Sequence, residues 1–368
     1  NFFELGGDSV VSVQVVALAN QVGLKLTPQL LFEHPTIADL AAVAQTAPAI
    51  QAEQGLVTGP IPLTPMQYEF FEQNLADSHR WSPTILLAVQ QALVPALLEE
   101  ALQQLLKHHD ALRLNFVQRE SGWQQTSAAP KAVAPWMHLD LAELSVEAQT
   151  SAIEATAAKL NASLNLATGP LISFAFLNAG TEEETRLLCA IHPLVADSVS
   201  LKILFDDLHR AYQHLSQGRA VQLGPKTTSF KYWSECLQTY AKSAQVASEL
   251  DYYWRSLSQQ PFWDLPVDHP EGINSEASVR TISITLTAQE TRSLLYDIPT
   301  VYKAELEEVL LTALLQALET EAEGRSLLVH VEKQGRSAMN HADIDVSRTV
   351  GQFTTAFPVR LASKQGAS

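Results

Sequence analysis

Apolar residues recur along the chain with two spacings, one typical of helices and one typical of strands. Helical spacing is found at Met66–Leu75, Pro95–Lys107, Val199–Leu215, Glu249–Leu257 and Leu306–Leu318. Strand character is found at Thr84–Val89, Leu171–Leu177, Arg186–His192, Arg280–Leu286 and Leu327–Val331. Arg280–Leu286 alternates most cleanly, as a half-buried strand does, and Leu327–Val331 is predicted to be a buried strand. Helices and strands in mixed order predict a layered α/β or α+β domain from Ile61 onward.

Residues 1–44 predict helices instead. Val10–Val22 is rich in β-branched residues, but its length, the absence of a turn and the polar pair before it favour a helix over a strand. Thr27-Pro28 predicts a helix start with proline in the first position, and Thr36-Ile37-Ala38-Asp39 resembles a capping box. Residues 45–60 have little periodicity and carry glycine and proline, which predicts a linker.

Composition narrows the class of protein. The 368 residues are 46% hydrophobic, without an apolar run long enough to span a bilayer, and the net charge of −16 argues against nucleic acid or an anionic membrane as partner. No secretory pattern opens the chain. Cys189 and Cys236 have neither metal nor disulfide spacing, so we expect buried free thiols, no metal site and a cytoplasmic location.

A glycine turn near the start of the chain leads into a serine. Gly6-Gly7 makes a tight turn, and Asp8-Ser9 can then open a helix, which exposes the serine hydroxyl at the positive helix end. The sequence of Phe2–Ser9, together with that of Leu31–Ile37, resembles the attachment site of peptidyl carrier proteins of nonribosomal peptide synthetases. The resemblance implies 4′-phosphopantetheine on Ser9, with Gly7 and Asp8 beside it.

That family also implies partners and a boundary. The arm would be added by a phosphopantetheinyl transferase, and would carry an aminoacyl or peptidyl thioester between neighbouring adenylation and condensation domains. A carrier domain is a small four-helix bundle, so residues 1–44 would be a partial bundle that lacks its first helix.

A second resemblance covers residues 61–361 discontinuously. The segments that carry it are Leu63–Phe71, His108–Arg113, Lys226–Phe230 with Trp233, Glu332–Arg336 and Arg348–Pro358. They resemble the condensation and epimerization domains of the same synthetases, and the last three favour the epimerization branch. The resemblance implies a two-lobed α/β fold like chloramphenicol acetyltransferase, with an N-terminal lobe at 61–225 and the crossover and an incomplete C-terminal lobe at 226–368. We expect His108 and His109 to be structural, near a helix C-terminus where the dipole favours cations.

The signature H-H-x-x-x-D-G of this superfamily is altered. His192 matches the first histidine, Pro193 replaces the second, Asp197 matches the aspartate and Ser198 replaces the glycine. In the family the second histidine does the acid–base chemistry, and proline can neither accept nor return a proton. If Ile191–Pro193 is extended, His192 faces away from the channel, although it is kept as a weaker catalytic candidate.

The second motif, E-G-H-G-R in the family, is also altered. Glu332 matches its glutamate and would be the remaining acid–base group, although an exposed acid at a strand end is the simpler interpretation. Gln334 replaces the histidine, whereas Gly335 and Arg336 are retained as structural residues. Asp197 would tie down its loop through an arginine that the sequence does not identify.

Three functions remain open at this point. The first is a carrier beside a degenerate epimerization-type domain that is inactive or nearly so, because inversion needs an acid and a base poised on opposite faces of the α-carbon. The second is an unusual condensation-type catalyst that forms an amide or ester by positioning. The third is a platform that recruits a tailoring enzyme acting in trans. The peptide itself is not encoded here.

Overall fold

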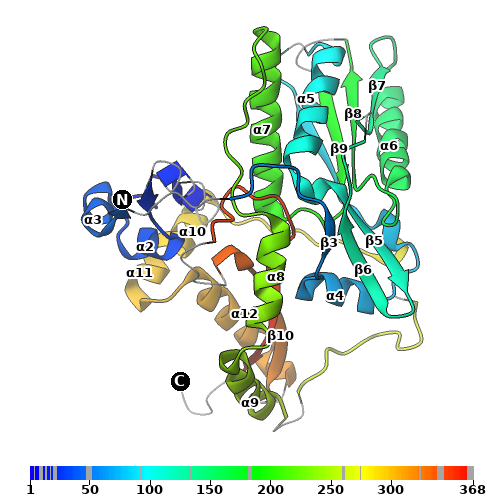
Figure 1. The fold of residues 1–368 in the computed structure, drawn as a ribbon. Helices are drawn as coiled ribbons and strands as arrows, with labels where there is room; N and C mark the ends of the chain where they lie inside the picture. Colours follow the sequence, from blue (N-terminus) through cyan, green and yellow to red (C-terminus); the bar gives the residue numbers. More distant parts are fainter. Residues whose placement is uncertain are drawn as a thin grey trace. The chain divides into compact units, whose positions relative to one another are not determined.

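The computed structural model describes most of the chain in two compact units (Figure 1). The described residues are 1–3, 5–7, 11–12, 15–16, 18–19, 23–46, 52–91, 93–131, 134–180, 185–258, 262–273, 275–322, 325–337 and 344–362. The first unit comprises Asn1–Ser243 with Lys333–Thr355, and the second comprises Ala244–Glu332 with Ala356–Ser368. In the described part of the chain, no helix combines the length and the apolar character that a membrane crossing requires.

The N-terminal region contains two short helices and one short strand pair; most of the predicted helix Val10–Val22 lies outside the described residues, and residues 11–12, 15–16 and 18–19 are helical. Its elements are β1 (Leu24–Lys25), α2 (Pro28–Glu33), α3 (Ile37–Val43) and β2 (Gln45–Thr46). Thr27 caps α2 by accepting from the Leu30 N–H, with Pro28 directly after it. Thr36 caps α3 by accepting from the Asp39 N–H, but the return bond to the Asp39 carboxylate comes from the Thr36 hydroxyl, so the predicted capping box is only half formed.

The first unit contains two antiparallel or mixed sheets that position the site. A three-stranded sheet has the order β3-β6-β5, and a four-stranded sheet has the order β4-β9-β8-β7, in which only the β7–β8 pair is parallel. The strands are β3 (Gly59–Ile61), β4 (Thr84–Ala88), β5 (Leu114–Arg119), β6 (Gly122–Ser127), β7 (Trp136–Asp140), β8 (Ile172–Asn178) and β9 (Arg186–Ile191). The helices are α4 (Pro65–Glu72), α5 (Pro95–His108), α6 (Val146–Ser163), α7 (Ser198–Ser216) and α8 (Phe230–Tyr240), with 3₁₀ turns at Ser78–Arg80 and Asp110–Arg113.

The four-stranded sheet is covered on both faces (Figure 1). Alternate residues of β8 point to opposite sides, so Phe174 and Phe176 join the core under α5 and α7, whereas Ala175 and Leu177 join the core under α6. Burial on both faces explains why β8 is apolar without alternation. The carboxyl end of β9 leads through a short turn into α7, and this turn carries the altered signature.

The predicted linker is anchored to the first unit at both ends. Gln45–Thr46 pairs with β1, and Gly59–Pro60 belongs to β3, which pairs with β6. Between them, the Gln54 side chain accepts from the Lys226 N–H at 2.8 Å and donates to the Lys226 carbonyl at 2.9 Å. The sequence pattern could not show this, because the partners are more than a hundred positions away.

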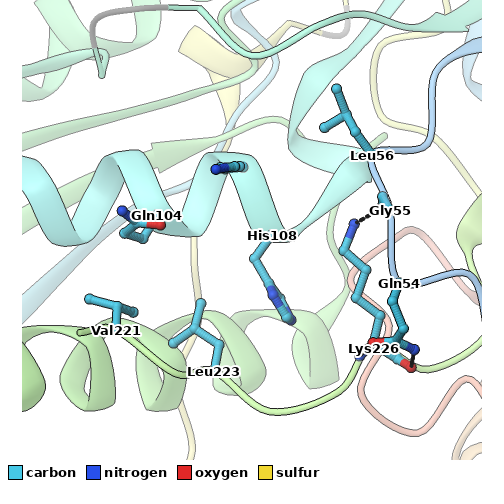
Figure 2. A pocket seen from close by; sticks show the side chains of 9 residues that line it. Gln54, Gly55, Leu56, Gln104, His108, Val221, Leu223 and Lys226 are labelled. Carbon is cyan, nitrogen blue, oxygen red and sulfur yellow. Dashed lines mark hydrogen bonds between the residues drawn. The ribbon is translucent and has the colours of Figure 1, made fainter.

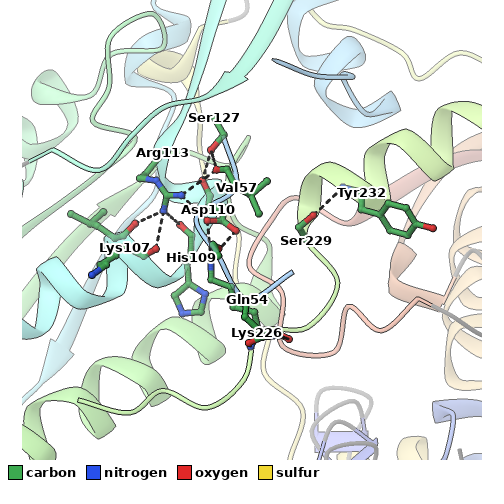
Figure 3. Close-up of polar contacts among 12 residues, drawn as sticks. Gln54, Val57, Lys107, His109, Asp110, Arg113, Ser127, Lys226, Ser229 and Tyr232 are labelled. Carbon is green, nitrogen blue, oxygen red and sulfur yellow. Dashed lines mark hydrogen bonds and ion pairs between the residues drawn. The ribbon is translucent and has the colours of Figure 1, made fainter. Parts of the chain in front are cut away.

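An ion network holds the same segment (Figures 2 and 3). The Lys226 ammonium donates to the Gly55 carbonyl at 2.9 Å and to both Asp110 carboxylate oxygens at 3.0 and 3.1 Å. Arg113 lies 2.6 Å from the same carboxylate and also donates to the Val57 carbonyl. Asp110 therefore holds in place the two cations that bind the linker backbone. Beside this network lies a cavity of about 340 Å³, whose lining includes Lys107 and His108.

The second unit departs from the sequence predictions at its strands. It holds α9 (Ala244–Ser258), a 3₁₀ turn at Glu276–Ser278, α10 (Ala288–Arg292), a π-helical turn at Ser293–Asp297, α11 (Ile298–Tyr302) and α12 (Leu306–Ala322). Strands β10 (Leu327–Gln334) and β11 (Thr354–Leu361) pair with each other; residues 333–334 and 354–355 belong to the first unit and the rest of the two strands to the second. Arg280–Leu286 forms no strand, because no neighbouring strand among the described residues pairs with it, and Ile282 and Ile284 are 90% and 89% exposed. The first part of β10 is a strand as predicted, but it is buried only in part: Leu327 is buried, whereas Leu328 is exposed.

Candidate functional site

The signature residues lie on the turn between β9 and α7. Strand β9 ends at Ile191, and the chain turns at Pro193, where the Val195 N–H donates to the His192 carbonyl at 3.1 Å. The condition considered for His192, an extended chain from Ile191 through Pro193, is therefore not met. The reason is local: the His192 N–H still donates to the Leu171 carbonyl beside the sheet at 2.9 Å, whereas Pro193 has no N–H to continue the ladder.

Both ring nitrogens of His192 are hydrogen-bonded to backbone groups. Its side chain is buried, with Nε2 at 2.9 Å from the Ser78 carbonyl, and its Nδ1 accepts from the Leu194 N–H at 3.3 Å. Nε2 therefore carries the proton of the neutral ring. Burial lowers the pKa of His192 to about 4, although the bond to Ser78 opposes the shift. A neutral ring with both nitrogens bonded to backbone cannot serve as the missing acid–base group.

Asp197 organises the start of α7, and its partner is Arg336. Its Oδ1 accepts from the Ser200 N–H at 2.7 Å, which caps the helix, and its Oδ2 accepts from the Phe353 N–H at 3.3 Å. The Arg336 Nη2 lies 3.0 Å from Oδ1, and both side chains are nearly buried, at 5% and 1% exposure. This is the arginine that the sequence did not identify, although Arg336 was already predicted to be structural.

Arg336 joins three segments of the first unit. Its Nη1 donates to the carbonyls of Val346 and Thr349 at 2.6 and 2.8 Å, and its Nη2 also donates to the Ser200 hydroxyl at 2.9 Å. The guanidinium lies 4.1 Å above the Phe353 ring, a cation–π contact. Burial lowers the pKa of Arg336, and the Asp197 carboxylate opposes this shift. The pair therefore has a structural function.

Gly335 explains how Arg336 reaches this position. The Gly335 N–H donates to the Phe353 carbonyl at 2.9 Å, and a Cβ on residue 335 would lie only 2.3 Å from that oxygen. Only glycine therefore allows the backbones to approach this closely.

The replaced motif positions are bonded to one another in pairs. Gln334 donates from Nε2 to the Ser198 hydroxyl at 3.2 Å, and both residues differ from the family motifs. Gln352, where the family motif R-T-V-G-W-F-T has tryptophan, donates from Nε2 to the Pro193 carbonyl at 3.0 Å and accepts from the Thr354 N–H at 3.0 Å. Each of the two glutamines therefore contacts another replaced residue.

Gln67 is a site residue to which the sequence analysis assigned no role. It is fully buried, accepts from the Thr64 N–H at 3.0 Å, and donates to Gln125 at 2.8 Å and to the Leu194 carbonyl at 3.1 Å. It therefore supports the turn directly after Pro193. A glutamine inside the apolar motif Leu63–Phe71 was the available signal, because buried amides need partners.

Glu332, the predicted acid–base glutamate, belongs to the second unit, whereas the turn at Pro193 belongs to the first. It lies on β10, and its side chain is exposed.

The two histidines near the end of α5 are held by burial and by contacts with other side chains, and the expected helix-end cation does not describe His108. His109 is buried with Nε2 at 3.1 Å from Asp207, and the other oxygen of Asp207 accepts from Arg348. Burial lowers the pKa of His108 to about 4. His108, His109 and Asp207 bring ligand-type atoms within 4.8 Å of one another, but both oxygens of Asp207 already have partners. The structural interpretation therefore stands, with an ion pair as its main cause.

The glycine turn near the N-terminus has the geometry that the attachment motif requires. Gly6 has φ +90°, and a Cβ on Gly7 would lie 2.4 Å from the Phe2 ring, so both positions need glycine. Phe3 stacks on Phe32 with ring centroids 4.8 Å apart, which joins the two halves of the motif. The predicted attachment residues Asp8 and Ser9 lie outside the described residues.

Two protein families match the chain. Residues 57–368 match the condensation domain, and residues 1–44 match the phosphopantetheine attachment site. One of the proteins that make up the linear gramicidin synthase of Brevibacillus parabrevis is 44% identical over 364 residues, which cover 99% of this chain and 5% of that protein. Tyrocidine synthase 1 of the same organism is 35% identical over 371 residues, which cover 100% of this chain and 33% of that protein. The chain thus spans a small part of these relatives.

Solved structures give the same fold. The epimerization domain from the third module of tyrocidine synthetase B is 32% identical, with a TM-score of 0.78, and the match covers 86% of this chain and 70% of that one. The first condensation domain of the calcium-dependent antibiotic synthetase is 22% identical, with a TM-score of 0.62 over 84% of this chain and 70% of that one. The second likeness is one of fold alone.

Proposed function

The chain belongs to the condensation-domain family of nonribosomal peptide synthetases and includes a phosphopantetheine attachment domain, and we propose that its larger domain receives carrier-bound cargo without inverting it. The observation that carries the proposal is the turn at Pro193. A ring without a titratable group stands where the family has its acid–base histidine, and Gln352 is bonded to the carbonyl of that same residue.

No nearby group of the turn replaces the lost histidine. His192 is buried, neutral and bonded at both nitrogens, and Asp197 is occupied by Arg336 and backbone N–H groups. The side chains that do face the replaced positions are amides and a hydroxyl, which donate and accept hydrogen bonds but do not exchange protons near neutral pH. Acid–base groups typically contribute 10²- to 10⁴-fold each, and inversion needs one on each face of the α-carbon, so the single group that remains should leave little racemisation.

The attachment domain carries covalent 4′-phosphopantetheine. We place it on Ser9, which directly follows the glycine turn, and expect a phosphopantetheinyl transferase to add it. When loaded, the arm supplies the thiol that holds the aminoacyl or peptidyl thioester. The proposal includes neighbouring adenylation and condensation domains as partners and a cytoplasmic location, which the free thiols Cys189 and Cys236 support.

The attachment is tested by mass. Incubation with a phosphopantetheinyl transferase and coenzyme A should add one arm to the wild-type protein and none to Ser9→Ala. An equal mass gain in both proteins would show that another residue is modified.

The lack of inversion is tested by hydrogen exchange at the α-carbon. Ser9 is loaded with an L-aminoacyl pantetheine in deuterated water, and deuterium in the cargo is followed by mass spectrometry. We expect exchange no faster than in a protein with Glu332→Gln, and clearly faster exchange in the wild type would contradict the proposal.

A further inference from the structure

The two glutamines at replaced motif positions use their amide groups differently. Gln352 is fully satisfied, because its Nε2 donates to the Pro193 carbonyl and its Oε1 accepts from the Thr354 N–H. Gln334 uses only its Nε2, which donates to Ser198. Its Oε1 is buried and has no hydrogen-bond partner in the described part of the chain. Gln352 is therefore committed to the fold, whereas Gln334 retains an unused acceptor.

A buried acceptor without a donor is unfavourable, because it has lost water and gained nothing in return. The terminal torsion of a glutamine is soft, so Gln334 can turn its Oε1 toward a donor that arrives beside it; the Nε2 bond to Ser198 is then given up, because both atoms belong to one planar amide. Ser198 lies exposed at the first position of α7. Its hydroxyl accepts from Gln334 and still has its own O–H to donate. The pair thus offers one acceptor and one donor next to each other.

An extended amino-acid residue presents the matching groups. Its N–H and its own C=O point to the same side of the backbone, as they do in the hydrogen-bonded pairs of an antiparallel sheet. In a carrier-bound residue these groups are the α-nitrogen N–H and the thioester C=O, and they flank the α-carbon.

We propose that Gln334 and Ser198 bind the thioester-linked residue of the cargo, with Gln334 accepting from its α-N–H and Ser198 donating to its thioester C=O. This rests on the proposed function only in taking the cargo to be carrier-bound. The pair positions the residue and selects for an unsubstituted α-nitrogen. A proline or an N-methylated residue at the thioester end leaves Gln334 without its donor and is bound more weakly.

The test measures binding of two soluble probes to the intact protein by ligand-observed NMR titration. One probe is the pantetheine amide of N-acetylalanine, in which nitrogen replaces the thioester sulfur, and the other is its N-methylated counterpart. Loss of one neutral hydrogen bond weakens binding roughly two- to tenfold. We expect the N–H probe to bind more tightly by this factor, and the difference to vanish in Gln334→Leu.

Two further variants keep the result interpretable. Ser198→Ala removes the donor at a helix start, where alanine is well tolerated, and should weaken both probes by a similar factor. Gln118→Leu makes the same side-chain change as Gln334→Leu at an exposed position on β5 and should change nothing.

Equal binding of both probes to the wild type, no binding of the N–H probe, or a preference that persists in Gln334→Leu would each overturn the proposal. Rapid α-deuterium exchange would contradict the proposed function but would leave this recognition intact. Equal probe binding without exchange would do the reverse.

Discussion

Replacing Arg336 by methionine removes the guanidinium that connects the start of α7 to the segments around Val346 and Phe353. The guanidinium makes polar contacts with Asp197, Ser200 and two backbone carbonyls, from a side chain that is 5% exposed. Methionine keeps an apolar contact with the ring but leaves the Asp197 carboxylate buried without its cation.

Removing one partner of a buried ion pair costs ~3–5 kcal/mol, because the remaining charge is stranded away from water. Helix α7, which Asp197 caps, offers a matched control. Its Lys202 pairs with Asp206 at 3.8 Å, and both side chains are more than 40% exposed. Lys202→Met should cost no more than ~1 kcal/mol. We therefore expect Arg336→Met to lower the free energy of unfolding of the first unit several times more than Lys202→Met does.

The measurement is urea unfolding of the first unit, followed by tryptophan fluorescence, with the denaturant slopes compared across variants. In the double variant Asp197→Asn with Arg336→Met no charge is stranded, so its loss should be smaller than the sum of the single losses. If Arg336→Met is no more destabilising than Lys202→Met, the role given to this ion pair is wrong.

Three further predictions concern buried groups. The pKa of His192 is about 4 in the folded protein and 6.5 in the unfolded chain. The stability that the neutral ring contributes is therefore fully present above pH 6.5 and falls by ~3 kcal/mol as the pH drops to 4. Unfolding measured across this pH range should show the loss, and an unchanged pH dependence in His192→Asn would contradict it. Gly351→Ala places a Cβ 2.4 Å from the Phe230 ring and should cost ~1–3 kcal/mol in the same urea assay, whereas wild-type stability would argue that the ring moves freely. Burial raises the pKa of Cys189, so a maleimide should label the half-buried Cys236 first, and the reverse order by peptide mapping would refute this.

Local patterns located most elements of the first unit. Apolar spacing predicted α5 and α7 to within a residue or two, because each helix packs a single apolar stripe against the sheet. Motif resemblance identified the altered signature at His192–Ser198 and the retained Asp197 within it. Both successes depend on neighbours in the sequence, or on a family that fixes them.

Pairings between distant residues could not be predicted in this way. Asp197 and Arg336 are 139 positions apart, and Ser198 and Gln334 are 136 apart. Each residue looks like an ordinary polar side chain until the fold brings it to its partner.

One strand prediction in the second unit failed for a related reason. The alternation at Arg280–Leu286 describes a segment that suits a half-buried strand, but a strand also needs a partner for its backbone groups. Periodicity carries no information on whether such a partner is present.

Whether the domain inverts its cargo can be read from the configuration of the released residue. An L-peptidyl thioester is loaded onto the carrier of the intact protein, incubated, released by hydrolysis and analysed by chiral chromatography, with a racemising synthetase domain as the positive control. We predict that the released residue stays L, apart from the slow background seen without protein. A D-configured fraction that grows with enzyme concentration would show that the turn at Pro193 has not ended proton transfer at the α-carbon.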